Sequence, residues 1–173
     1  MPADAGGDGN YQLRLLAPSD DLVVLTAMLH RAYAALAVRG MHFLASHQNV
    51  DVTRRRLEKG ECWVALADDA IIGTIVLKDA ASTNGSPWYD RPDVACFGQF
   101  AVEPAWQGRG LGSALVDQVE QRARAKGVTE LALDTAEGAD NLIAFYARRG
   151  YRFIEHTKWN DVNYRSVIMS KRL

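Results

Sequence analysis

Residues 107–112 read QGRGLG, and this short stretch indicates more about the chain than any other segment. It follows an apolar run of strand length, Val94–Val102, which Glu103-Pro104 brings to an end. The residues after it repeat an apolar side chain at every fourth position, the spacing of one apolar stripe along a helix: Leu111, Leu115, Val119 and Ala123. The sequence therefore predicts a strand, a glycine-rich loop and a helix in direct succession.

The glycines of this loop suit an anion. Gly108, Gly110 and Gly112 leave backbone N–H groups uncovered where the helix begins, and the helix dipole adds partial positive charge. A phosphate or pyrophosphate is therefore the expected ligand. A P-loop requires Lys-Ser or Lys-Thr after its glycines, and neither follows here. The dinucleotide-binding pattern G-x-G-x-x-G also fails, because its last glycine would fall on Ser113 or Leu115, depending on whether the pattern starts at Gly108 or Gly110. A simple tight turn is the alternative, although one glycine would be enough for it.

Two motifs together resemble one family. Q-x-x-G-x-G after a strand and a Pro resembles the acyl-CoA pyrophosphate loop of the GNAT superfamily of N-acetyltransferases. Residues 141–153, which read NLIAFYARRGYRF, are similar to a second motif of that family, a short helix followed by a strand. The resemblance implies a mixed α/β fold: a central, mostly antiparallel sheet of about seven strands with helices on both faces. In such relatives the strands around the cofactor splay apart, and the acyl chain lies in that wedge.

The resemblance also implies a cosubstrate and its binding residues. Acetyl-CoA is expected, without a metal, and its pyrophosphate and pantetheine arm are expected to contact these residues: Phe100, Ala101, Val102, Gln107, Gly108, Arg109, Gly110, Leu111, Gly112, Ser113, Asn141 and Tyr146. Phe100–Val102 match the strand whose backbone pairs with the pantetheine arm as an added strand would, with plain sheet core as the alternative. For Arg109 the alternative is a solvated surface charge, and for Asn141 a helix N-cap.

Tyr146 is the expected catalytic residue. A Tyr hydroxyl has an ordinary pKa of about 10 and is protonated at neutral pH, so it can donate to the thiolate that leaves when an amine attacks the thioester. Relatives place a Tyr at this motif position for that task. The alternative is a core residue on the same helix face as Leu142.

The general base is less well defined. Relatives often use a carboxylate on the strand at 94–102, but this stretch has none, and the amide of Gln99 is not a useful proton acceptor. Asp134, Glu137 and His42 are the candidates, acting directly or through a water. Each has a surface or structural role as its alternative, and a substrate that arrives as a neutral amine needs no strong base.

The acceptor is expected to bind between two variable regions, residues 33–53 and 79–93. Aromatic residues with a few polar groups suit the primary amine of a small molecule, which would attack directly within a ternary complex. Residues 54–56 read RRR and form either a solvated helix face or a contact with an acidic acceptor. Two other functions stay open: an acyl-CoA-binding sensor without turnover, and acetylation of a protein N-terminus or lysine. An ordered 79–93 loop that closes the site would count against a peptide acceptor.

Composition places the chain among ordinary globular proteins. Its 173 residues, 48% hydrophobic and 24% charged, fit one domain at 11–173 after a disordered leader at 1–10. A net charge of -1 gives no reason to expect nucleic-acid binding, and no apolar run reaches the roughly 18 residues of a membrane helix. Without a signal-peptide pattern, and with Cys62 and Cys96 expected as buried free thiols, we expect a cytoplasmic protein. The oligomeric state stays open, a homodimer included.

Local patterns predict the remaining elements. Apolar periodicity and turn residues indicate strands at 11–17, 62–67, 70–77, 130–135, 151–159 and 164–171, and helices at 22–36, 51–59 and 141–150. Asp68-Asp69 is expected to form a hairpin turn, and residues 41–50 and 79–93 to be irregular.

Overall fold

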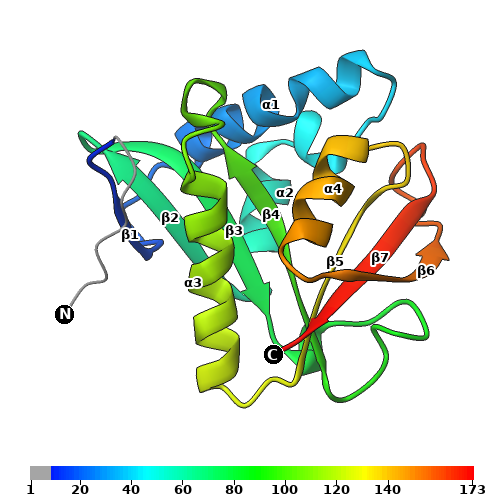
Figure 1. Cartoon of the computed structure of the whole chain (residues 1–173). Helices are drawn as coiled ribbons and strands as arrows, with labels where there is room; N and C mark the ends of the chain where they lie inside the picture. Colours follow the sequence, from blue (N-terminus) through cyan, green and yellow to red (C-terminus); the bar gives the residue numbers. More distant parts are fainter. Residues whose placement is uncertain (1–8) are drawn as a thin grey trace.

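The structure of the chain is a computed structural model, and it describes residues 9–173 (Figure 1). Most of the expected leader at 1–10 therefore lies outside the described residues. The described strands are β1 (Gln12–Leu15), β2 (Glu61–Ala67), β3 (Ala70–Lys78), β4 (Val94–Val102), β5 (Glu130–Ala136), β6 (Arg152–Thr157) and β7 (Ser166–Arg172). The described α-helices are α1 (Leu22–Val38), α2 (Val50–Leu57), α3 (Leu111–Ala125) and α4 (Asp140–Arg148).

These strands form one seven-stranded sheet in the order β1-β2-β3-β4-β5-β7-β6. Every neighbouring pair is antiparallel except β4 and β5, which are parallel. The sheet therefore confirms the predicted fold class. The tight connection between β2 and β3 also follows the prediction, because Asp68 and Asp69 have φ angles of 47° and 64°, which suit a two-residue hairpin turn.

The predicted elements occur in the predicted order, with local differences. The last two strands are shorter than expected, because β6 and β7 begin to pair only at Thr157 and Ser166, and the residues between them form a loop. The two regions expected to be irregular each contain a short 3-10 turn, Leu44–Ser46 and Ala80–Ser82. The helix expected to start at Asn141 starts one residue earlier with Ala139 as its N-cap, so the N-cap interpretation of Asn141 is wrong.

Helices cover both faces of the sheet (Figure 1). α3 and α4 pack on one face, where Leu115 belongs to the larger buried cluster. α1 and α2 pack on the other face, where Leu29 belongs to a second cluster. Successive residues of β3 point to opposite faces, so Ile75 joins the first cluster and Val76 the second. Both sides of the central strands are therefore buried.

The parallel pair β4 and β5 is joined only at one end. The register links Val94–Cys96 of β4 to Glu130–Ala132 of β5, and no pairing between these strands is recorded beyond that point in the described chain. The rest of β4 therefore has an open side where the two strands diverge, which is the wedge that the resemblance implied.

A β-bulge lies in this open part of β4. Gly98 is opposite Val76 of β3, whereas Ala101 is opposite Thr74, so β4 contains one residue more than its partner. Gln99 is within the extra length and has a φ of 48°, a value that residues other than glycine rarely adopt. Bulges redirect side chains and often lie next to functional sites.

Candidate functional site

The glycine-rich loop leads into a helix N-terminus that no described side chain caps. Gly110 is the N-cap residue of α3 and has a φ of 85°, and Gly108 has a φ of 75°. A Cβ at either position would meet no atom within 4 Å, so the backbone conformation, and not crowding, calls for glycine there. The first N–H groups of α3 lack partners inside the helix and can donate hydrogen bonds to a bound anion.

A cavity of about 700 Å³ lies beside this loop, and we call it the loop cavity. Most of the predicted cofactor-binding residues line it: Phe100, Ala101, Val102, Gln107, Gly108, Gly110, Gly112, Ser113, Asn141 and Tyr146. Two predicted residues do not. Arg109 lies over the Trp106 ring at 5.0 Å, and Leu111 is buried in the core, so their side chains have other partners.

Several residues that line the loop cavity were not among the predicted cofactor-binding residues, although Leu142, Phe145 and Arg148 lie within the motif at 141–153. α1 contributes Ala32, Tyr33, Ala35 and Leu36, its C-cap residue is Arg39, and the region of α4 contributes Ala139, Leu142, Phe145 and Arg148. The two arginines add positive charge to a cavity whose loop already suits phosphate. The periodicity of α1 indicates a packed helix and nothing more, because its residues reach the cavity only through tertiary packing.

A second cavity, of about 630 Å³, lies where β4 and β5 diverge, and we call it the Asp134 cavity. The strands contribute Phe97–Phe100 and Leu133-Asp134. Both variable regions contribute as well, as the sequence predicted, and so does the loop between β6 and β7, which the sequence did not indicate. The charged residues that line the cavity are Arg56, Lys59, Lys78, Asp134 and Asp161.

The two cavities share Tyr33, Phe100 and Tyr146. The Tyr33 hydroxyl donates to the backbone carbonyl oxygen of Phe100 at 2.6 Å, which holds Tyr33 against the open part of β4. Burial raises the pKa of Tyr33 to about 12, so its hydroxyl stays protonated and remains a donor. These three residues form the boundary at which ligands in the two cavities would meet.

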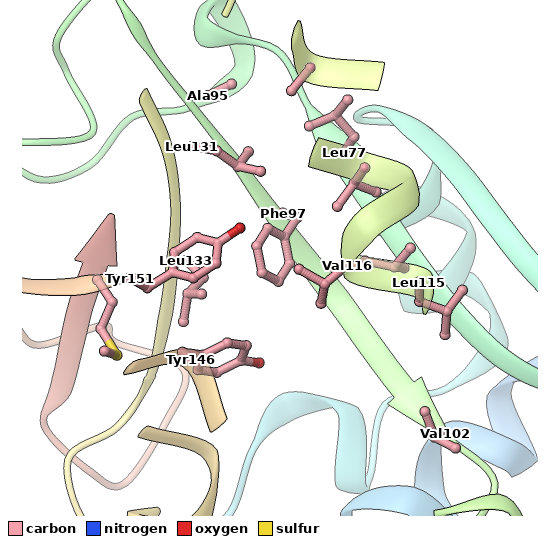
Figure 2. Packing of buried hydrophobic residues seen from close by; sticks show 14 of the residues in the cluster. Leu77, Ala95, Phe97, Val102, Leu115, Val116, Leu131, Leu133, Tyr146 and Tyr151 are labelled. Carbon is pink, nitrogen blue, oxygen red and sulfur yellow. The ribbon is translucent and has the colours of Figure 1, made fainter. Parts of the chain in front are cut away.

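Tyr146 is buried at this boundary, with 5% of the residue exposed. Figure 2 shows its ring reaching from α4 toward β4 beside Phe97, whose ring centroid is 6.1 Å away. Burial raises the pKa of Tyr146 well above its ordinary value, and the nearby Tyr33 and Asp134 raise it further. The hydroxyl therefore stays protonated at physiological pH and can donate a hydrogen bond.

Asp134 is the only one of the three candidate bases that lines either described cavity. Its carboxylate accepts hydrogen bonds from the Tyr89 hydroxyl at 2.8 Å and from the Trp159 indole N–H at 3.0 Å. Glu137 instead forms a surface ion pair with an arginine at 2.7 Å. The backbone N–H of His42 donates to a loop asparagine, and its side chain lines neither cavity.

The arginines at 54–56 do not share one role. Arg54 and Arg55 are exposed, as expected for a solvated helix face, whereas Arg56 is partly buried and lines the Asp134 cavity. The Arg56 guanidinium donates to the side-chain oxygen of Gln48 at 2.7 Å. The Gln99 amide, with its oxygen turned toward Arg56, accepts from Nη1 at 2.7 Å. The bulge on β4 therefore places an amide beside a cation.

Comparison with known families identifies the class of protein. A model described as "Acetyltransferase (GNAT) family" matches residues 28–151, which is well over half of the chain. The match includes the glycine-rich loop, Asp134 and the three residues at the boundary of the cavities. The chain therefore belongs to the GNAT acetyltransferase family, as the two sequence motifs predicted.

Curated relatives of known activity include two acetyltransferases. The chain is 31% identical over 147 residues to S-(2-succino)cysteine N-acetyltransferase of Bacillus subtilis (strain 168), an alignment that covers 82% of each chain. It is 27% identical over 155 residues to mycothiol acetyltransferase of Beutenbergia cavernae, covering 87% of this chain and 51% of the relative. The second relative is therefore about half covered by this chain.

Solved structures share the fold at low sequence identity. A GNAT family acetyltransferase from Elizabethkingia anophelis with acetyl-CoA bound has a TM-score of 0.69 and 18% identity, over 95% of this chain and 99% of that one. A Bacillus subtilis acetyltransferase in complex with CoA has a TM-score of 0.64 and 19% identity, over 95% and 99%. These likenesses confirm the GNAT fold.

Three further observations bear on the expectations from the sequence. Cys62 and Cys96 are both free and buried, as predicted. Within residues 9–173, no group of three or more His, Cys, Asp or Glu side chains is placed to hold a metal ion. No helix in the described part of the chain has both the length and the apolar character needed to cross a membrane.

Proposed function

We propose that the chain transfers the acetyl group of acetyl-CoA to the primary amine of a small molecule, by direct attack within a ternary complex. The observation that supports this most strongly is that the two cavities meet at Tyr33, Phe100 and Tyr146. In this proposal the loop cavity holds the cosubstrate and the Asp134 cavity holds the amine. The solved relatives with acetyl-CoA or CoA bound support the choice of cosubstrate.

The loop cavity has suitable groups for each part of the cosubstrate. The start of α3 offers backbone N–H groups to the pyrophosphate, and Arg39 and Arg148 are cations on the same cavity. The carbonyl oxygens of Phe100 and Val102 accept from the Tyr33 hydroxyl at 2.6 Å and from the Gln107 amide at 3.1 Å. A carbonyl oxygen has two lone pairs, so an extended pantetheine arm can pair with the same strand.

The chemistry follows from the groups at the boundary. Acetyl-CoA supplies a thioester carbonyl carbon; as the amine nitrogen bonds to it, the C–S bond breaks and its electron pair leaves with the sulfur. Tyr146 donates a hydrogen bond to that sulfur. Because a thiol of ordinary pKa about 8.5 is a stronger acid than a buried tyrosine, Tyr146 stabilises the thiolate by hydrogen bonding and does not give up its proton. Asp134 accepts the proton that the amine loses, directly or through a water.

The ordered 79–93 loop supports a small acceptor over a peptide. Its residue Trp88 donates a backbone N–H to Glu155 at 2.9 Å, and Tyr89 is 3% exposed with its hydroxyl bound to Asp134. The loop therefore forms a fixed wall of the Asp134 cavity where a protein chain would need an open groove. The relatives named for S-(2-succino)cysteine and mycothiol also point to small acceptors.

A thiol-release assay tests the proposed function. The chain is incubated with acetyl-CoA and panels of amines, amino acids, polyamines and peptides, with S-(2-succino)cysteine included, and products are identified by mass spectrometry. We expect CoA release coupled to N-acetylation of a small primary amine. Acetylation of peptides alone would favour a protein acceptor. Tight binding of acetyl-CoA without any turnover would favour a sensor and contradict the proposal.

A further inference from the structure

Arg56 is a cation in the Asp134 cavity that has no carboxylate partner. Among residues 9–173 its guanidinium forms no ion pair, and its recorded partners are the amide oxygens of Gln48 and Gln99. Neutral amides satisfy N–H donors but do not cancel the charge. Burial lowers the pKa of Arg56, yet an arginine side chain stays protonated in proteins. The cavity therefore contains a fixed positive charge that forms no ion pair in the described chain, although Asp134 and Asp161 on the same cavity attract it.

A buried polar network fixes the position of this charge. Gln48 is 2% exposed, and its amide nitrogen donates to the Thr53 hydroxyl at 2.8 Å. The Thr26 hydroxyl donates to Thr53 at 2.8 Å and joins the network to α1. The guanidinium of Arg56 therefore rests on groups that are already held in place, and little side-chain entropy remains to be lost when an anion binds.

The neutral side chain of Gln99 leaves the Arg56 guanidinium without an ion-pair partner. The bulge on β4 directs the Gln99 side chain to Arg56, and a carboxylate at position 99 would form an ion pair there. The amide keeps the geometry and leaves the charge for a ligand. Because β4 has no carboxylate, it offers no candidate base. For the same reason, it leaves the positive charge of Arg56 without an ion-pair partner on this strand.

The other charges of the cavity fit an acceptor with two different ends. Lys59 and Lys78 line the same cavity as Arg56, and neither forms an ion pair within the described residues. Of the two carboxylates on the cavity, Asp161 acts on Arg56, and Asp134 acts on both Arg56 and Tyr146. In the proposed function the reacting amine lies beside Tyr146, and therefore near Asp134. A molecule with an amine directed to Asp134 and an anionic group directed to Arg56 matches this arrangement.

We propose that the acceptor is an amine that carries at least one carboxylate, such as an amino acid, and that Arg56 binds this carboxylate. The planar guanidinium can hold a carboxylate through two parallel hydrogen bonds, and the neighbouring lysines favour more than one anionic group. The inference rests on the proposed function, because it assigns the class of amine that enters the Asp134 cavity.

A binding experiment tests whether Arg56 holds a carboxylate, and it does not require turnover. Succinate, a dicarboxylate, and succinamide, its neutral counterpart, are titrated into the CoA-saturated protein by isothermal calorimetry. We expect succinate to bind and succinamide to bind at least about 10-fold more weakly, because hydrogen bonds to a charged group are the stronger ones. Arg56→Gln should weaken succinate binding by about 10- to 100-fold. Arg55→Gln, on the exposed side of the same helix, should leave it unchanged.

Gln99→Glu gives a second test in which Arg56 is retained. The new carboxylate would pair with Arg56 and neutralise it in place, so succinate binding should fall as it does in Arg56→Gln. This variant keeps the buried network intact and covers the case in which Arg56→Gln does not fold. Kinetically, the best acceptor of the panel is compared with derivatives whose carboxylates are converted to amides one at a time. In both variants KM should rise about 10- to 100-fold for the carboxylate form and little for the matching amide.

The results separate this inference from the proposed function. Turnover of amines without preference for the carboxylate forms, with succinate bound no better than succinamide, would overturn the role of Arg56 and leave the acetyltransferase proposal standing. Succinate binding that depends on Arg56, without acetylation of any amine, would contradict the proposed function and leave the anion site standing. Wild-type succinate binding in a folded Arg56→Gln or Gln99→Glu variant would also overturn the inference.

Discussion

The loop cavity and the Asp134 cavity adjoin, yet they are built in different ways. The loop cavity depends on backbone: the free start of α3, the left-handed conformations of Gly108 and Gly110, and the open side of β4. The Asp134 cavity depends on side chains, such as Arg56 and Asp134, from segments that are far apart in the sequence. Backbone geometry is tied to the fold, whereas side chains can be exchanged singly. Under the proposed function, the site of the cosubstrate is therefore set by the fold, and the site of the acceptor by exchangeable side chains.

Asp134→Asn should have the largest effect, and the effect should be confined to the acceptor side. If the carboxylate accepts the amine proton, kcat should fall by about 100-fold or more at neutral pH, since positioned proton transfer is typically worth that much. The affinity for acetyl-CoA should not change, because Asp134 does not line the loop cavity. Steady-state kinetics and calorimetry measure the two quantities. Glu137→Gln is the control, and a kcat near wild type in Asp134→Asn would remove this residue from the mechanism.

Gly110→Val should weaken the binding of acetyl-CoA. A β-branched side chain at a φ of 85° strains the loop and stands where phosphate approaches the start of α3, so the Kd for acetyl-CoA should rise about 100-fold, the equivalent of losing one charge-assisted hydrogen bond.

Gly127→Val is the matched control for this change. Gly127 follows the C-terminal end of the same helix, has a φ of 76°, and offers a Cβ the same empty space. Similar losses of thermal stability in the two variants, with weakened binding only in Gly110→Val, are expected. An unchanged acetyl-CoA affinity in folded Gly110→Val would show that the glycines serve only the turn.

Tyr146→Phe should lower kcat by about 10- to 100-fold with little change in KM for acetyl-CoA. A hydrogen bond to a charged sulfur that exists only late in the reaction is worth about this much, and the aromatic packing is retained in Phe. Tyr151→Phe is the control, because Tyr151 belongs to the same buried cluster but donates to Glu120, away from both cavities. Equal turnover in Tyr146→Phe and wild type would assign Tyr146 to the core.

Tyr33→Phe should have the smallest effect, and it should change KM for both substrates. Loss of the bond to the Phe100 carbonyl costs about 1 kcal/mol, so KM should rise a few-fold, about 2- to 10-fold, for acetyl-CoA and for the acceptor together. Tyr164→Phe should change only the acceptor KM, because Tyr164 lines the Asp134 cavity alone. A change confined to one substrate in Tyr33→Phe would mean that the cavities do not meet at this residue.

The contrast between a cavity built from backbone and one built from side chains also explains which parts of the site could be predicted from the sequence. The glycine loop, its strand and helix, and Tyr146 were predictable, because each lies in a contiguous motif whose spacing fixes its local geometry. The motif could not tell that Arg109 and Leu111 turn away from the cavity, since side-chain direction depends on neighbours such as Trp106.

The acceptor side was predictable only in outline. The two variable regions do line the Asp134 cavity, and Asp134 was among three candidate bases, but nothing in the local sequence distinguished it from Glu137. Arg56 reads like its exposed neighbours, because only the position of α2 against β4 directs it inward. The role of Gln99 depends on a bulge, which is set by the pairing of β4 with β3 and has no local pattern.

The proposed function requires direct transfer between ligands held in both cavities at once, and initial-rate kinetics distinguish this from transfer through an acetylated protein. Both free thiols are buried, Cys62 at 6% and Cys96 at 2% exposed, and neither lines the loop cavity or the Asp134 cavity, so no cysteine is placed to carry the acetyl group between them. We expect intersecting double-reciprocal lines when both substrates are varied, and an unchanged intact-protein mass after incubation with acetyl-CoA alone. Parallel lines together with an acetylated protein that passes its acetyl group to the amine would contradict direct transfer.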